Sequence, residues 1–158
     1  MTDFKLLLPF GMDLTGEHKI TNQLNERLAT SGFRFTAQRQ HVYNVLLDKR
    51  DHPTAEEVFL RAKHEMPDIS MATVYNCLDA LVKCSLVRQV NVDRGATRFC
   101  PNMQEHWHFY CDHCGGVHDV DAAADRQSMA FQLPDGFKVN HYEISLRGIC
   151  RRCAQDKN

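Results

Sequence analysis

The segment SMATVYNCLDALVKCSLVRQVNVDRGATRFC, residues 70–100, changes its hydrophobic period part-way along. Val74, Leu78 and Leu81 recur at helical spacing and predict a helix that begins after Ser70. LVRQVNV and ATRFC alternate as strands do, and they flank the turn residues DRG. A helix followed by a hairpin is the order that closes a winged helix, whose last helix enters the major groove of DNA. A small helical domain with a hairpin of no particular function is the alternative.

Three further helices are predicted upstream of this segment. Residues 20–31 carry apolar side chains at helical spacing, and a second helix is expected to begin near Thr36. A third opens at Thr54, where Glu57 stands three residues on and completes a capping box. This third helix must end before Pro67.

The pattern changes again after residue 100. HFYC and GGVHDV are strand-like pieces around a C-x-x-C motif, AAADRQSMAFQL (122–133) predicts a helix, and KVNHYEISLRGIC (138–150) predicts a final strand. The predicted fold class is therefore α+β. We divide the chain into an N-terminal extension (1–19), a winged-helix DNA-binding domain (20–100) and a small α/β domain (101–158).

Composition narrows the class of protein. Of the 158 residues 43% are hydrophobic and 25% are charged, as in soluble globular proteins, and no apolar run is long enough to span a membrane. The N-terminus lacks the features of a signal peptide, and seven cysteines include two C-x-x-C pairs, so we expect a reducing, cytoplasmic compartment. Residues 19–98 carry twelve Lys and Arg against nine acidic residues, a slight excess that suits an anionic partner.

The two C-x-x-C pairs predict a metal site. Cys111 and Cys114 form one pair, and Cys150 and Cys153 form the other. Four thiolates from two tight turns make a closed tetrahedral site, the structural form of zinc, with no position left for a substrate. The alternative is that one pair is a redox dithiol and the other is incidental.

A second group of candidate ligands lies around the first pair. His106 and His108 are two apart on a predicted strand, so their imidazoles face the same side. Asp119 ends the next strand and Cys100 ends the hairpin, so these four residues could converge on a second ion. A solvated pair of surface histidines is the simpler alternative.

These motifs, taken together, resemble the ferric uptake regulator family of bacterial metal-dependent repressors. The resemblance covers nearly all of residues 20–155 and keeps the order of the motifs. The matching pieces are GFRFTAQR (32–39), HPTAEEVF (52–59), ISMATVYNCLDAL (69–81), RFC (98–100), EHWHFYCDHCGGVHDV (105–120) and NHYEISLRGICRRC (140–153).

The resemblance implies a homodimeric repressor in which residues 101–158 form the metal-binding dimerisation domain. It implies that the four cysteines hold structural zinc. It also implies a second, regulatory divalent metal that joins the two domains. The ligands implied for that metal are His52, Cys100, His106, His108 and Asp119.

Cys100 departs from the pattern of the iron and peroxide sensors that this chain resembles, which carry a carboxylate there. A thiolate with imidazoles suits Zn(II) better than hard Mn(II), so we expect a zinc sensor. His52 is a feature of the iron and peroxide branches, and an Fe(II)- or Mn(II)-dependent peroxide-sensing repressor is therefore the alternative.

The expected partner is operator DNA in double-stranded form, A·T-rich and palindromic. The helix after residue 70 would supply the residues that contact DNA, and by resemblance Arg34 would enter the minor groove, where narrow A·T tracts enhance negative potential. The candidate DNA-binding residues are Arg34, Ser70, Thr73, Tyr75 and Asn76.

Two classes of enzyme are alternatives to a regulator. A zinc hydrolase or deaminase built on His106, His108 and Cys100 needs a nearby general base, and the H-x-E and P-C-x-x-C signature of the deaminases is absent. A thiol oxidoreductase would use one C-x-x-C pair, and near-stoichiometric zinc that does not exchange from the purified protein would argue against it. We therefore expect no enzymatic activity.

Overall fold

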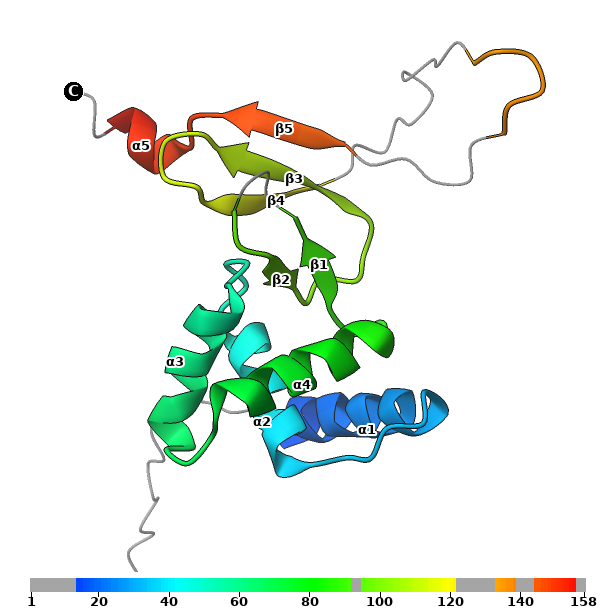
Figure 1. Cartoon of the computed structure of the whole chain (residues 1–158), viewed down its shortest axis with the longest axis vertical. Coiled ribbons are helices and arrows are strands. Elements are labelled where there is room, and N and C mark those ends of the chain that lie inside the picture. Colours follow the sequence, from blue (N-terminus) through cyan, green and yellow to red (C-terminus); the bar gives the residue numbers. More distant parts are fainter. Residues whose placement is uncertain (1–13, 92–94, 122–132, 139–143, 156–158) are drawn as a thin grey trace, which may run out of the picture.

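The computed structural model describes residues 14–91, 95–121, 133–138 and 144–155. A helical half lies at one end of the molecule, a small sheet lies at the other, and a two-stranded hairpin lies between them (Figure 1). This arrangement confirms the predicted α+β class. In the described ranges no helix has both the length and the apolar character that crossing a bilayer requires. The helices of the first half are α1 (Leu14–Thr30), α2 (Ala37–Asp48), α3 (Ala55–Glu65) and α4 (Met71–Lys83).

Helix starts follow local capping chemistry. Thr36 caps α2, and Thr54 with Glu57 forms the predicted capping box at α3, through bonds of 3.2 Å and 2.7 Å. Ser70 caps α4 by accepting a bond of 3.1 Å from the Thr73 amide. The exception is α1, which begins at Leu14 rather than at residue 20. No proline interrupts residues 14–19, and the helix extends through Gly16 despite the low helix propensity of glycine.

One apolar core holds the helical half together. Val74, Leu78 and Leu81 of α4 are buried in it, as the helical spacing predicts. Each fully buried side chain of this size contributes about 1.5–3 kcal/mol. Cys77 and Cys84 lie in the same core, where they behave as small apolar side chains.

The hairpin pairs β1 (Arg88–Val90) with β2 (Arg98–Cys100) in antiparallel register. Both strands are shorter than predicted. Leu86 and Val87 pack in the helical core, and the Leu86 amide donates to the Leu81 carbonyl at 3.0 Å, so these residues close α4 instead of joining the ladder. Most of the predicted turn lies outside the described residues.

The hairpin also connects the two halves. Phe99 packs into the helical core. Val90 and Cys100, on the two strands, join Tyr110 and Val117 of the second half in a small buried cluster. The last residue of the hairpin therefore lies at the boundary between the halves.

The second half is a three-stranded sheet in the order β4–β3–β5. β3 (His106–Cys111) is antiparallel to β4 (Val117–Asp121) and parallel to β5 (Ser145–Gly148), and the short helix α5 (Arg151–Gln155) follows. The predicted helix over 122–133 lies outside the described residues except for its last position, and so do residues 139–143 of the predicted final strand.

Candidate metal centre

Two groups of metal-ligating side chains converge in the described part of the chain. In each group the candidate ligand atoms lie within 4.8 Å of one another. Every member of both sets predicted from the sequence is included. The first group is Cys111, Cys114, Cys150 and Cys153, and the second is His52, Cys100, His106, His108 and Asp119.

Strand pairing brings the four cysteines together. Cys111 ends β3, and the turn after it carries Cys114 and then Gly115, which adopts a φ of +66° that glycine tolerates. The parallel ladder places Gly148 of β5 beside Cys111, so Cys150 follows two residues later. The Sγ atoms of Cys114 and Cys150 are 3.9 Å apart. Tetrahedral zinc with Zn–S bonds of about 2.3 Å requires about 3.8 Å.

Backbone amides favour the thiolate form in this group. Hydrogen bonds from the backbone of Cys114 and of Cys150 lower the pKa of Cys111 to about 6. The Cys150 amide donates to Cys111 Sγ at 3.3 Å. Burial and the neighbouring sulfurs raise the pKa of Cys153 to about 12, so the four thiols do not all ionise together without a cation. A divalent soft cation is the species that this donor set accommodates.

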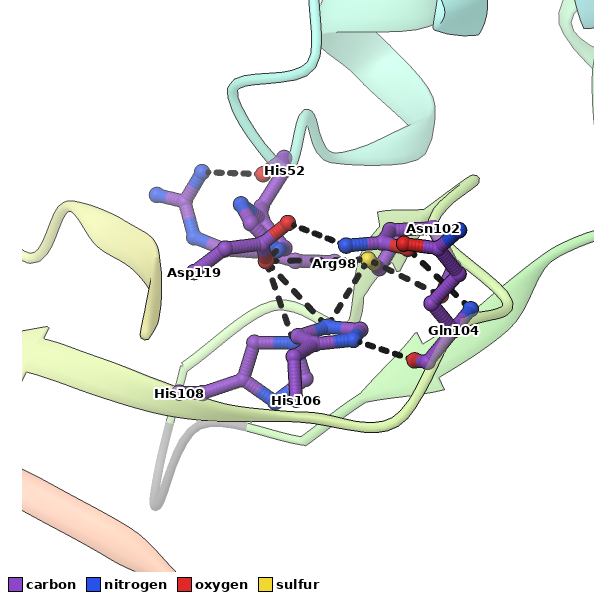
Figure 2. Close-up of polar contacts among 8 residues, drawn as sticks. His52, Arg98, Asn102, Gln104, His106, His108 and Asp119 are labelled. Carbon is purple, nitrogen blue, oxygen red and sulfur yellow. Dashed lines mark hydrogen bonds and ion pairs between the residues drawn. The ribbon is translucent and has the colours of Figure 1, made fainter. Parts of the chain in front are cut away.

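The second group draws on both halves of the molecule (Figure 2). His106 and His108 alternate on β3 and therefore face the same side, and the antiparallel register sets Asp119 of β4 opposite His108. Cys100 is the last residue of β2. His52 comes from the loop before α3, in the helical half.

One carboxylate oxygen lies at the centre of this group. Asp119 Oδ1 is 2.8 Å from Nε2 of His52, 3.2 Å from Nε2 of His106 and 3.7 Å from Nε2 of His108. Cys100 Sγ is 3.9 Å from the same oxygen and 3.5 Å from His106 Nε2. Figure 2 shows the side chains of His52, His106, His108 and Asp119 gathered around this point.

His52 is held in place by the hairpin. Its φ of +53° is uncommon for a residue other than glycine. The Arg98 guanidinium donates to the His52 carbonyl at 2.9 Å, and the Phe99 amide donates to the Pro53 carbonyl at 3.0 Å. The hairpin therefore holds the loop that carries His52 through two hydrogen bonds.

The donor set fits a metal ion. Both ring nitrogens of His52 are buried, and neither makes a well-aligned hydrogen bond with the described residues. Nε2 faces Asp119 Oδ1 at 2.8 Å, and a cation bound at Nε2 would recover free energy that the burial of this nitrogen costs. Three imidazoles, one carboxylate and one thiol are ligands of borderline divalent metals.

The protonation states at neutral pH also suit a cation. Burial, together with the neighbouring histidines, lowers the pKa of His108 to about 4, and burial likewise lowers the pKa of His52. Burial alone would raise the pKa of Asp119, but the hydrogen bond from Asn102 and the nearby histidines bring it below its usual value. Burial raises the pKa of Cys100 to about 11. At neutral pH the imidazoles of His52 and His108 are therefore neutral and the Asp119 carboxylate is ionised, so all three can bind a metal directly. The Cys100 thiol must first lose its proton.

This thiol predicts a pH dependence. A metal that binds Cys100 as a thiolate must displace its proton at any pH below about 11, so affinity rises with pH. In Cys100→Asp the new carboxylate is already ionised at neutral pH, so this proton is not released. Calorimetry at pH 7 in buffers of different ionisation enthalpy should show about one proton fewer released by the variant. Equal proton release would mean that Cys100 is not a ligand.

The predicted DNA-contact residues lie on exposed parts of the helical half. Tyr75 is 52% exposed, and Asn76 is also exposed on α4. The hydroxyls of Ser70 and Thr73 are hydrogen-bonded to each other at 2.8 Å, and Ser70 also caps the helix. Arg34 is exposed in the loop before α2.

Three residues that support the second group are not among the predicted site residues. Arg98 holds the His52 loop, and the Gln104 carbonyl contacts His106 Nδ1 at 2.7 Å, which leaves Nε2 facing the other ligands. Asn102 donates to Asp119 Oδ2 at 2.9 Å. An asparagine or glutamine in an irregular segment has no motif by which a sequence alone would single it out.

Comparison with known proteins adds the family. The model of the ferric uptake regulator family matches residues 30–147, well over half of the chain. The chain belongs to the ferric uptake regulator family. The peroxide-responsive repressor PerR of Staphylococcus epidermidis is 30% identical over 143 residues, which cover 88% of this chain and 95% of that protein.

Solved structures of ferric uptake regulator proteins share the fold. The Campylobacter jejuni peroxide stress regulator is 26% identical with a TM-score of 0.59, covering 90% of this chain and 100% of its own. The Helicobacter pylori ferric uptake regulator Fur has a TM-score of 0.70 at 21% identity, and the match covers 87% of this chain and 93% of that chain. The latter likeness is one of fold.

Membership in the ferric uptake regulator family makes this chain a metal-responsive transcriptional repressor and not an enzyme. The zinc hydrolase and the thiol oxidoreductase are thereby set aside.

Proposed function

We propose that this chain binds operator DNA as a homodimer when a regulatory metal occupies His52, Cys100, His106, His108 and Asp119, and that the four-cysteine group holds structural zinc. One observation supports the regulatory site above the others: His52 Nε2, from the helical half, lies 2.8 Å from Asp119 Oδ1 in the sheet half. An ion bound to both residues would link the DNA-binding domain to the dimerisation domain. Acting on bacterial DNA, the repressor would work in the cytoplasm.

Such a link supplies a mechanism for regulation. A ligand shifts an equilibrium only through its different affinity for the two states. Ligands from both halves come together in one arrangement of the domains, so the ion stabilises that arrangement. In a dimer this sets the spacing of the two α4 helices, and operator half-sites require a fixed spacing.

The edge of the sheet supports the homodimer. Among the described residues β5 is one of the two edge strands of the sheet, and three of its four residues are exposed. Leu146 on the strand is 37% exposed, and Ile149 just after it is 48% exposed. An edge strand with apolar side chains is a template for pairing with a second copy. Light scattering of the zinc-loaded protein tests this, and a monomer at micromolar concentration would contradict it.

For the signal, we propose peroxide, with Fe(II) as the regulatory ion. This proposal is supported by the relative at 30% identity, which is named a peroxide-responsive repressor. That name favours peroxide sensing over zinc sensing. Fe(II) is the redox-active choice: it would supply the electrons for peroxide chemistry, whereas Mn(II) would support DNA binding without it. The buried side chains of His52, His106 and His108 and the exposed Asp119 would bind and orient it.

Zinc sensing is the second candidate, and Cys100 favours it. Its thiol is 1% exposed and lies 3.5 Å from His106 Nε2, where a thiolate would suit Zn(II). We expect Cys100→Asp to bind operator only at a higher free Zn(II) than the wild type and to respond better to Fe(II) or Mn(II).

Operator binding across buffered Zn(II), Fe(II) and Mn(II) decides between the two signals. If the wild type responds to Fe(II) and loses DNA on peroxide, with oxygen added to His52 or His106, it is a peroxide sensor. If it responds to Zn(II) alone and ignores peroxide, it is a zinc sensor. If Cys100→Asp leaves the zinc response unchanged, the thiol is not a regulatory ligand.

The DNA-reading role of α4 has its own test. Asparagine can pair with adenine through two hydrogen bonds, which are worth about 1–3 kcal/mol of discrimination. We expect Asn76→Ala to weaken binding to the operator about 5- to 150-fold, while binding to scrambled DNA, which depends on phosphate contacts, changes little. Fluorescence anisotropy with both DNAs at one salt concentration measures this. An equal loss on both DNAs would mean that Asn76 does not read bases.

A further inference from the structure

The side chain of Asn102 makes two hydrogen bonds beside the five-ligand group, and the Asn102 carbonyl accepts a third from Cys100 Sγ at 3.8 Å. Its Nδ2 donates to Asp119 Oδ2 at 2.9 Å, and its Oδ1 accepts from the Gln104 amide at 3.1 Å. Figure 2 shows the Asn102 amide lying against the carboxylate. Neither the zinc motif nor the ligand set includes this residue.

The orientation of the Asn102 amide is fixed by its second bond. The Gln104 amide is a backbone N–H and can only donate, so the atom facing it must be the side-chain oxygen of Asn102. The atom facing Asp119 is therefore the NH₂ group. A donor is thus held permanently toward one oxygen of the carboxylate.

The two oxygens of Asp119 consequently have separate roles. Oδ2 is engaged by Asn102, and Oδ1 faces His52, His106 and His108 at 2.8–3.7 Å. We propose that Asn102 is a positioning residue: it makes Asp119 bind the metal through one oxygen and thereby disfavours Mn(II). This inference rests on the regulatory metal site proposed above.

The number of ligand atoms connects this bond to metal preference. With one atom from each residue the group offers five donor atoms. A carboxylate that binds through both oxygens would raise the number to six, the octahedral arrangement that Mn(II) prefers. Zn(II) takes four or five ligands and gains nothing from the sixth. The hydrogen bond from Asn102 keeps Oδ2 away from the ion and so holds the lower number.

Two variants separate the effect of the hydrogen bond to Asp119 from that of the local turn, which is closed by the bond between Asn102 Oδ1 and the Gln104 amide. Asn102→Ala removes both side-chain hydrogen bonds. Asn102→Ser keeps an oxygen that can accept from the Gln104 amide, but its side chain is too short to reach Asp119. If the bond to Asp119 matters, the two variants behave alike, and if only the turn matters, Asn102→Ser behaves like the wild type.

The measurements use full-length protein with its four-cysteine zinc in place, titrated at the second site with Zn(II), Mn(II) and Co(II) against chelators of known affinity. Zn(II) affinity should fall about 10- to 100-fold in both variants, as for other residues that orient a ligand, and Mn(II) affinity should fall less. The visible absorption bands of Co(II) should weaken, because they lose intensity as the coordination number rises.

Several results would overturn the inference. Unchanged Co(II) bands with an unchanged ratio of Zn(II) to Mn(II) affinity would exclude any positioning role, and an equal loss for both metals with unchanged bands would indicate a structural role. Wild-type behaviour of Asn102→Ser would assign the effect to the turn. A wild-type protein that takes up no second ion would instead overturn the proposed function on which the inference rests.

Discussion

Cys150→Ser is expected to release the zinc of the four-cysteine group and to dissociate the dimer. Cys150 follows β5, its Sγ lies 3.9 Å from that of Cys114, and its amide donates to Cys111 Sγ. The binding free energy of a structural zinc is about 10–16 kcal/mol. That is as large as the whole stability of a typical domain, about 5–15 kcal/mol. Loss of one thiolate should therefore unfold the ordered end of the sheet, including the edge strand proposed to pair with a second copy.

The measurement is zinc content after dialysis against a weak chelator, together with the mass in solution. Cys100→Ala is the matched control, because it removes a buried cysteine from the other group and should leave the four-cysteine zinc in place. A zinc-free Cys150→Ser protein that remains a folded dimer would show that this group does not hold the domain together.

His108→Ala is expected to abolish metal-dependent operator binding. Its Nε2 lies 2.9 Å from that of His106, and β3 directs both rings toward Asp119. Removing a residue that only orients a ligand costs about 10- to 100-fold in metal affinity, and removing a ligand should cost more than about 100-fold. Without the ion the two halves lose the link through His52, so operator binding at a fixed low metal concentration should disappear.

His118→Ala is the control for this variant. His118 is exposed and lies on β4 next to Asp119, and strand alternation points it to the other face of the sheet. Operator binding and second-site metal affinity should stay within about threefold of the wild type, as for most surface substitutions. If the two variants lose equal affinity, or if His108→Ala keeps full metal-dependent binding, the second group is not the regulatory site.

Local chemistry in the sequence is enough to predict the starts of α2, α3 and α4, the four-cysteine group and four of the five residues of the second group. His52, the fifth, is predicted only through the resemblance to the family. The capping box at Thr54 and Glu57 acts within four residues, so it can be read without any tertiary information. The same holds for two thiolates in one C-x-x-C turn, and for His106 and His108 on one face of a strand. The inward side chains of α4 follow from a period of 3.6 residues.

The contacts between distant segments follow from packing and could not be read in the same way. Leu86 and Val87 look like a strand, but the helical core buries them and shortens β1. The approach of His52 to Asp119 depends on a φ of +53° that Arg98 secures from 46 positions away. The contact of Asn102 with Asp119 likewise depends on how the irregular segment after β2 lies against β4. Such contacts depend on how the hairpin packs against both domains at once. Many residues distant in the sequence contribute to that packing, so no local sequence pattern predicts it.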